Sequence, residues 1–391
     1  MSDEKNLPKG KDIKRQFGFN REDYNVNEIT ADFVAFNKDL AKNLLRRAER
    51  GLITGKGLKL VLLHKRGDGK THMANYVANT LSQRDLVKKI YLVNPAMSRG
   101  SRYIELHKVI IKALRDNNII LNIFNKAFAK RTKGMSDISS SRNVLNAFEA
   151  YQSKKATETE LIRYISGDKL TSAVLEKLNV TGTLDTHEAL KLLQMIADLF
   201  WNIDGKMIML IIDEVDNLKE VTLGARDFKE AFRQIAEISK LSIMFIFNVA
   251  PEEKLSIEVL PSPLKDTGVV TRIGSRNYMI APETMRISEL RTFIAEVNQR
   301  LRGDDFKNAL ARAVKDFGKE EIDAELFPFT NKGFKSFERN VQKFLSESEK
   351  GRALLPRSVL SYVNDCCAEA VLSGKTAIDE KVVEDVGVFS Q

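Results

Sequence analysis

An apolar run that leads into Gly-Lys-Thr carries the clearest chemistry in this sequence. Residues 58–63 are mostly apolar, the chain then reaches Gly69, Lys70 and Thr71, and a helical pattern follows. In a strand, loop and helix of this kind, backbone N–H groups of the loop and of the helix N-terminus point at phosphate groups. Lys70 would neutralise the β- and γ-phosphates of a nucleotide, and the Thr71 hydroxyl would ligate Mg²⁺.

The loop differs at one position from the full pattern G-x-x-x-x-G-K-[ST], since His64 stands where the first glycine is expected. A glycine there permits a tight turn without a Cβ atom. We expect nucleotide binding to survive this change and turnover to be slow. Taken alone, Gly-Lys-Thr also fits an ordinary turn. The candidate nucleotide-contacting residues of this segment are His64, Lys65, Arg66, Gly67, Asp68, Gly69, Lys70, Thr71 and His72.

A second apolar run closes on two carboxylates. Residues 207–212 suit a central parallel strand that is buried on both faces. Asp213 and Glu214 follow it and would lie at the C-terminal edge of the sheet, where α/β sheets place ligand chemistry. Asp213 would hold the Mg²⁺ shell, and Glu214 would polarise the attacking water. The alternative is a buried strand followed by a helix N-cap, since Asp caps helices well.

The elements that must position these residues form an alternating pattern of strands and helices. Strands are expected at 58–63, 89–95, 207–212, 241–248 and 277–281, and helices over 31–50, 70–82 and 224–240. The segment between the second and third strands is helical almost throughout and is longer than a βαβ crossover requires. The expected domains are an N-terminal arm (1–30), an α/β nucleotide-binding core (31–95 and 204–282), a helical insertion (96–203) and a helical lid (283–391).

The composition excludes a membrane protein. Charged residues make up 29% of the chain and hydrophobic residues 43%, as in ordinary globular proteins. No apolar run reaches the roughly 18 residues that span a membrane, and the acidic start of the chain is not a signal peptide. The adjacent Cys366 and Cys367 indicate reduced core residues and a cytoplasmic location. The four histidines have no metal-ligand spacing. The net charge of +9, from 62 basic and 53 acidic residues, permits an anionic partner without requiring one.

Several of these motifs, in this order, resemble the AAA+ ATPases, specifically the initiator clade of Orc1/Cdc6-like proteins and the related transposition regulators. The phosphate loop matches that family's at Gly67, Gly69, Lys70 and Thr71, and the Asp213-Glu214 pair matches its Walker B end. The resemblance covers roughly residues 30–95 and 205–390. It implies an α/β class with a P-loop AAA+ core, a parallel sheet, a large helical insertion and a C-terminal helical lid.

The same resemblance implies three further site residues. Asn248 matches the polar sensor 1 residue, whose amide would orient the lytic water. Arg272 falls on the arginine-finger position, from which it would reach the γ-phosphate bound by a neighbouring subunit, with Arg276 as the second choice. Arg357 matches the sensor 2 residue of the lid and would be directed at the bound nucleotide. Each assignment has an alternative. Asn248 would form a turn at the end of its strand, and Arg272 and Arg276 would be plain surface charges. Arg357 would be a solvated residue in the first turn of a helix that begins with proline.

Two departures from the family pattern bear on the partner. The insertion carries a basic tract near a Ser-rich loop at 136–141, which would grip nucleic-acid phosphates or form a solvated face. The sequence also ends soon after the lid, without room for the winged-helix DNA-binding domain that replication initiators usually carry there. This second departure weakens the origin-binding interpretation. The basic tract consists of Lys126, Lys130, Arg131 and Lys133.

We therefore expect an ATPase that uses ATP and Mg²⁺, forms a homo-oligomeric ring or filament, and regulates a DNA transaction such as transposition, replication or defence against mobile elements. Two alternatives remain open. One is a nucleotide-bound scaffold that recruits a protein partner and hardly hydrolyses ATP, which His64 favours. The other is a defence-type signalling ATPase whose insertion senses a protein. The intact Asp213-Glu214 pair favours the hydrolysing enzyme.

Overall fold

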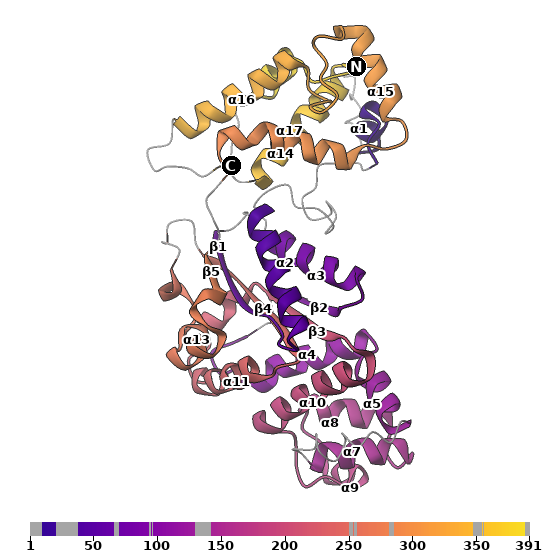
Figure 1. The fold of residues 1–391 in the computed structure, drawn as a ribbon, viewed down its shortest axis with the longest axis vertical. Helices are drawn as coiled ribbons and strands as arrows, with labels where there is room; N and C mark the ends of the chain where they lie inside the picture. The colour runs from indigo at the N-terminus through magenta and orange to yellow at the C-terminus, as the bar shows by residue number, and fades with distance from the viewer. Residues whose placement is uncertain are drawn as a thin grey trace, which may run out of the picture. The chain divides into compact units, whose positions relative to one another are not determined.

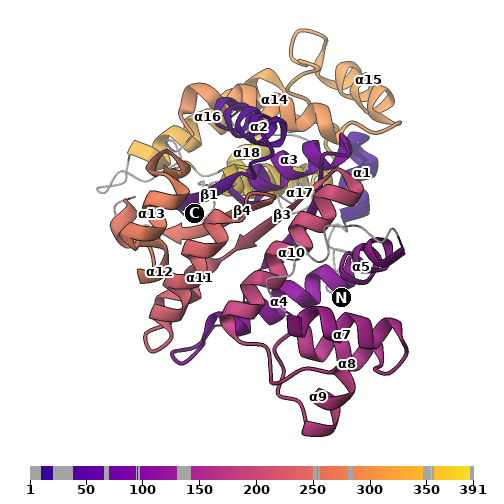
Figure 2. The same cartoon turned by 60° about the horizontal axis from the view of Figure 1, so that its bottom comes forward.

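The computed structural model describes residues 10–20, 38–65, 70–93, 95, 97–129, 142–249, 253, 256–280, 285–346, 354 and 356–387. Within these ranges the chain forms two compact units, drawn in Figures 1 and 2. The larger unit holds the sheet and the helical insertion, and the smaller one combines an N-terminal helix with the C-terminal helices. No helix in the described ranges is both long and apolar enough to cross a membrane.

The larger unit is built on a five-stranded parallel sheet with the strand order β2-β3-β4-β1-β5. The strands are β1 (Lys59–Lys65), β2 (Val87–Val93), β3 (Met207–Asp213), β4 (Leu241–Val249) and β5 (Tyr278–Ile280). All seven residues of β3 are buried, because helices cover both faces of the sheet and its strands are therefore continuously apolar. The predicted parallel α/β class is confirmed, and each expected strand is present.

Helices cover the two faces of the sheet in different ways. On one face, strand side chains such as those of Val61 and Leu63 belong to a single hydrophobic core that also contains the insertion and α11 (Ala225–Glu237). In Figure 2, α2 (Lys38–Ile53) and α3 (Lys70–Gln83) lie on the other side of the sheet. The unit also contains η1 (Val215–Lys219), η2 (Ile257–Val259), α12 (Ser262–Lys265), α13 (Thr267–Ile273) and η3 (Ser275–Asn277). Of the helix predicted over 31–50, residues 31–37 lie outside the described part.

The predicted insertion is a bundle of helices that shares its core with the sheet. It comprises α4 (Tyr103–Asp116), α5 (Ile120–Ala129), α7 (Arg142–Gln152), α8 (Glu158–Ile165), α9 (Ser172–Leu178) and α10 (Thr186–Asp204). Phe124 and Phe148 stack inside it with ring centroids 3.5 Å apart. In the basic tract, Lys126 forms an ion pair with Asp204 at 2.8 Å. The other three members of the tract and the Ser-rich loop lie outside the described residues.

One histidine of the insertion is a core residue. His107 is fully buried, and its Nε2 atom lies 2.9 Å from the carbonyl oxygen of Ile165. Burial lowers the pKa of His107 to about 4, so its ring is neutral at pH 7. Among the described residues, no group of three or more His, Cys, Asp or Glu side chains is arranged to hold a metal ion.

The smaller unit contains the predicted helical lid. Its C-terminal helices are α14 (Ile287–Leu301), α15 (Phe306–Phe317), α16 (Asn331–Ser346), α17 (Pro356–Leu372) and α18 (Glu380–Val386). They enclose a core rich in phenylalanine, in which Phe329 and Phe337 pack edge to face at 5.1 Å. Cys366 and Cys367 lie in α17 as free, buried thiols, as the sequence predicted.

Residues 10–20 of the expected N-terminal arm (1–30) pack into the smaller unit. Residues Gly10–Phe17 form α1, and Phe17 and Phe19 are buried in the core of the lid unit. The backbone N–H of Asn20 donates to the carbonyl oxygen of Leu301 at 2.7 Å. Gly18 has φ +66°, and a Cβ atom there would lie 2.6 Å from the backbone of Asp305. The segment is therefore an integral part of the lid unit, although the sequence separates the two by nearly 270 residues.

Replacing Phe17 with Ala should destabilise the lid unit by about 3–5 kcal/mol, the usual cost of removing a buried phenylalanine ring. The Phe17 side chain has no exposed surface and packs against Phe327 at 6.1 Å. Hydrogen exchange of the α15 and α17 amides measures the loss of local stability. Leu372→Ala is the matched control, because Leu372 is 45% exposed in the same unit. Equal exchange rates in the two variants would contradict the docking of α1.

Candidate active site

The Asp213 carboxylate is held from two sides at the carboxyl end of β3. The residue is only 2% exposed. Its Oδ2 atom accepts a hydrogen bond from the Tyr91 hydroxyl at 2.6 Å, and its Oδ1 atom accepts one from the Glu214 backbone N–H at 2.8 Å. Tyr91 lies on β2, the strand next to β3. The phenol and the backbone together fix the orientation of a carboxylate that the sequence placed at the ligand edge of the sheet.

Glu214 has a backbone conformation that few residues other than glycine adopt. Its φ of 55° and ψ of 46° lie in the left-handed region, which costs an L-residue roughly 1–2 kcal/mol. Such strain is typical of functional sites, where it aims a side chain. Glu214 is also the N-cap residue of η1, yet its side chain makes no capping hydrogen bond. Glu214 therefore occupies the N-cap position that the alternative expected after the strand, but its side chain does not cap the helix.

Asn248 is fixed by a carboxylate that the sequence analysis did not identify. Its backbone N–H donates to Oδ1 of Asp216 at 2.9 Å, and its Nδ2 donates to Oδ2 of the same residue at 2.8 Å. The Oδ1 atom of Asn248 is buried and has no hydrogen-bond partner within the described part of the chain. Asp216 follows Asp213 by three residues, so a third carboxylate in the turn after the strand was the signal available in the sequence.

The phosphate-loop candidate has the expected strand and helix around it. Strand β1 ends at Lys65 and α3 begins at Lys70. His64 lies opposite Asn248 in the β1–β4 register, so the strand that enters the loop runs beside the strand that carries Asn248. The four loop residues Arg66, Gly67, Asp68 and Gly69 lie outside the described residues. So do the side chains of His64, Lys65, Lys70, Thr71 and His72, and their contacts with a nucleotide stay predictions.

Arg272 lies at the opposite edge of the sheet from the carboxylates. It is an exposed residue of α13, whose Nε donates to Oε1 of Glu237 at 2.5 Å. It lines a groove of about 510 Å³ together with Gly57 and Leu58, which precede β1. Asn248 of β4 lies opposite His64 near the other end of β1, and this seven-residue strand spans about 20 Å, six intervals of roughly 3.3 Å. Arg272 is therefore remote from the Asp213, Glu214 and Asn248 cluster of its own chain.

The two remaining arginines are described to different extents. Arg276 is exposed in η3, and its carbonyl oxygen accepts a hydrogen bond from Arg47 at 3.1 Å. Arg357 is the second residue of α17, directly after Pro356. This agrees with the expected proline at the start of the lid helix. The Arg357 side chain lies outside the described part, so its direction towards a nucleotide stays a prediction.

Comparisons with known proteins give similarity in fold and none in sequence. No protein-family model and no curated protein matches the chain. The Orc1 protein of Aeropyrum pernix in complex with DNA is similar over 93% of this chain and 68% of its own, with 11% identity and a TM-score of 0.48. Cdc6p from Pyrobaculum aerophilum is similar over 94% of this chain and 71% of its own, with 9% identity and a TM-score of 0.46. Drosophila ORC bound to DNA is similar over 99% of this chain and 67% of its own, with 12% identity and a TM-score of 0.43. Because these scores lie below 0.5, the assignment of function depends on the residues of this chain.

Proposed function

We propose that this protein is an AAA+ ATPase of the initiator clade that binds ATP with Mg²⁺ through its phosphate loop. One observation carries the proposal. Asp213, Glu214 and Asn248 gather at the carboxyl edge of a parallel sheet, beside the strand that leads into Gly-Lys-Thr. This edge is where α/β sheets bind ligands. The three side chains have the chemistry that nucleotide hydrolysis needs, namely a metal-binding carboxylate, a base and a polar amide.

The residues at this edge fit a magnesium–nucleotide complex. Mg²⁺ prefers oxygen ligands, which the Asp213 carboxylate and the Thr71 hydroxyl would supply. The buried Oδ1 atom of Asn248, which lacks a partner among described residues, is placed to accept a hydrogen bond from a water molecule. The bound nucleotide supplies a γ-phosphoryl group that can be transferred to water. Glu214 would take a proton from that water, and Lys70 would hold the phosphates.

A specific contact favours the scaffold alternative, in which ATP is bound and turned over slowly. The backbone N–H of Asn248 and one N–H of its side-chain amide both donate hydrogen bonds to the Asp216 carboxylate. The Asn248 amide keeps one N–H that Asp216 does not use, but its orientation is fixed by that carboxylate, so it would have to leave Asp216 to reach a γ-phosphate lying in another direction. Together with His64 in the loop, this contact supports slow or assembly-dependent turnover. The signalling alternative, in which the insertion senses a protein, shares the same nucleotide site.

The proposed assembly is a head-to-tail ring or filament that regulates a DNA transaction. The position of Arg272 supports it, because an arginine at the edge of the sheet opposite the carboxylates is remote from the site of its own chain and, as a finger, would have to serve the site of a neighbouring copy. In such an interface, each subunit contributes a different face. The net charge of +9 agrees with a polyanionic partner. A protein partner within a larger assembly is the alternative.

Lys70→Ala should weaken Mg-ATPγS binding by at least about 30-fold, because losing one partner of a desolvated charge pair costs about 2 kcal/mol or more. Isothermal titration calorimetry measures the affinity directly. Lys319→Ala is the matched control, since it removes an exposed lysine from the turn after α15 in the lid unit. Unchanged affinity in the Lys70 variant would show that the Gly-Lys-Thr segment is an ordinary turn.

A further inference from the structure

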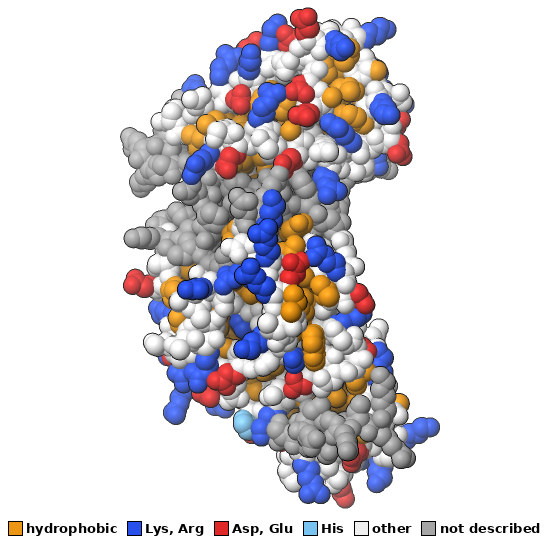
Figure 3. Space-filling view, viewed as in Figure 1, with side chains coloured by type: hydrophobic (Ala, Val, Ile, Leu, Met, Phe, Trp, Pro, Cys, Tyr) orange, Lys and Arg blue, Asp and Glu red, His pale blue; other side chains and the backbone are white. Residues whose placement is uncertain are grey.

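A stripe of positive side chains runs along the exposed face of α2. Lys42, Arg46 and Arg50 follow one another at intervals of four residues, so they lie on the same face of the helix. We call these three residues the basic stripe. Each interval advances about 6 Å along the helix axis. In Figure 3, Lys and Arg side chains gather over the part of the surface where Figure 1 draws α2.

Within the described part of the chain, no acidic side chain forms an ion pair with the basic stripe. All three side chains of the stripe are exposed. Two described acids nearby are already engaged. Glu49 of the same helix pairs with Arg84, and Glu237 pairs with Arg272. The stripe therefore presents a net positive field to solvent.

The helix that carries the stripe is held firmly against the unit. Its Ala41, Leu44 and Ala48 are buried on the opposite face. Arg47 reaches away from the stripe, and its guanidinium donates to the carbonyl oxygen of Arg276 at 3.1 Å and to Oδ1 of Asn277 at 2.5 Å. Arg47 thus ties α2 to the turn before β5. The spacing of the stripe is fixed by a packed helix and not by a loop.

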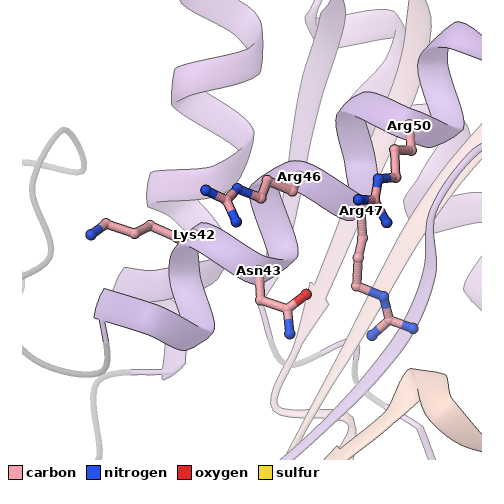
Figure 4. A pocket seen from close by; sticks show the side chains of 5 residues that line it. All are labelled: Lys42, Asn43, Arg46, Arg47 and Arg50. Atoms are coloured by element: carbon pink, nitrogen blue, oxygen red, sulfur yellow. The ribbon is translucent and has the colours of Figure 1, made fainter.

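The hollow along the stripe is bordered by polar and charged side chains. A groove of about 490 Å³ is lined by Lys42, Asn43, Arg46, Arg47 and Arg50 alone (Figure 4). A second groove continues past Arg50 to the exposed Lys56. Specific protein interfaces have an apolar or aromatic centre, whereas the described lining of the first groove contains no apolar residue, and the exposed Ile53 lies beyond Arg50 at the end of α2. The features of the stripe are positive charge, guanidinium groups and a linear repeat.

We propose that the basic stripe binds the phosphodiester backbone of a nucleic acid. Guanidinium groups match phosphate oxygens with paired hydrogen bonds. A row of cations on one helix face matches a linear polyanion better than it matches the scattered carboxylates of a protein. The contact is with backbone and carries no base readout, so it positions the strand without specifying sequence. It is a surface separate from the nucleotide site and does not depend on the proposed ATPase activity.

The test compares a triple variant with a matched control. The variant Lys42→Ala/Arg46→Ala/Arg50→Ala leaves the structural Arg47 in place. The control removes three exposed lysines from the lid unit, Lys307, Lys315 and Lys319, so both proteins lose the same charge. Fluorescence anisotropy measures binding to a labelled duplex DNA and to a single-stranded RNA of equal length, with and without Mg-ATPγS. Each titration is repeated at several salt concentrations, and circular dichroism checks that both variants fold.

We expect the triple variant to bind at least 10-fold more weakly than the wild type. The slope of log Kobs against log [salt] should fall by about 2–3, since each lost phosphate contact removes roughly 0.9 from it on duplex DNA. The control should stay within 2-fold of the wild type. The nucleic acid that the wild type binds more tightly, DNA or RNA, identifies which phosphodiester backbone the stripe prefers.

Three results would overturn the proposal. The wild type could fail to bind either nucleic acid with and without nucleotide. The control could lose as much affinity as the triple variant, which would indicate a general charge effect. The triple variant could keep its affinity for nucleic acid while losing self-association in sedimentation, which would make the stripe an interface between copies. Loss of nucleotide binding in Lys70→Ala alone would bear on the proposed ATPase and not on the stripe.

Discussion

Glu214→Gln should bind Mg-ATP as tightly as the wild type and hydrolyse it about 10²–10⁴-fold more slowly, the usual loss when a general base is removed. The amide keeps the size and polarity of the side chain but cannot accept the proton of the attacking water. Asp213 and its hydrogen bonds to Tyr91 and to the Glu214 backbone N–H are unchanged by the substitution. The metal site and the left-handed backbone of Glu214 should therefore both persist.

A steady-state phosphate-release assay, read beside calorimetric ATP affinity, measures both halves of this expectation. Glu220→Gln is the control, because Glu220 is an exposed carboxylate at the end of η1, six residues further along the chain. Equal turnover in Glu214→Gln and the wild type would place the base elsewhere. If the wild type shows no turnover, alone or with DNA, the result would favour the scaffold function, which the contact between Asn248 and Asp216 also supports.

The sheet was predictable because its strands are buried on both faces. The run at 207–212 contains only apolar residues, and β3 covers Met207–Asp213 in the structure. A helix of that length would expose part of its surface, so uninterrupted apolar residues bounded by polar ones favour a central strand. The carboxylates at the end of this run then had to lie at the ligand edge. Local sequence was sufficient for this part of the site.

The contacts that the sequence did not reveal join segments far apart in the chain. Asp216 and Asn248 are 32 residues apart, and Tyr91 and Asp213 are 122 apart. Nothing in the local pattern around Tyr91 distinguishes it from any aromatic strand residue. The docking of α1 was missed for the same reason, since Phe17 and Phe19 are isolated apolar residues in a polar segment. Their burial depends on helices at the other end of the chain.

Arg272→Ala should lower ATP turnover by about 10³–10⁵-fold while ATP affinity stays near the wild-type value, as expected for an arginine finger. The residue cannot act within its own chain, because it lines a groove at the amino end of β1 and the carboxylates lie at the carboxyl edge. To serve a neighbouring site, its side chain must leave Glu237. Assembly would thus switch turnover on.

Mixing two inactive variants decides whether the arginine acts in trans. Lys70→Ala lacks the phosphate contact but keeps Arg272, and Arg272→Ala has the reverse. In an equimolar mixed ring or filament, about one interface in four pairs an intact loop with an intact arginine. Activity should return to about that fraction of the wild type. Each variant alone is the control, and light scattering with ATP confirms assembly. If the mixture shows no activity and the protein stays monomeric, a trans-acting arginine is ruled out. If activity returns when Arg276→Ala replaces Arg272→Ala in the mixture, the finger is Arg276.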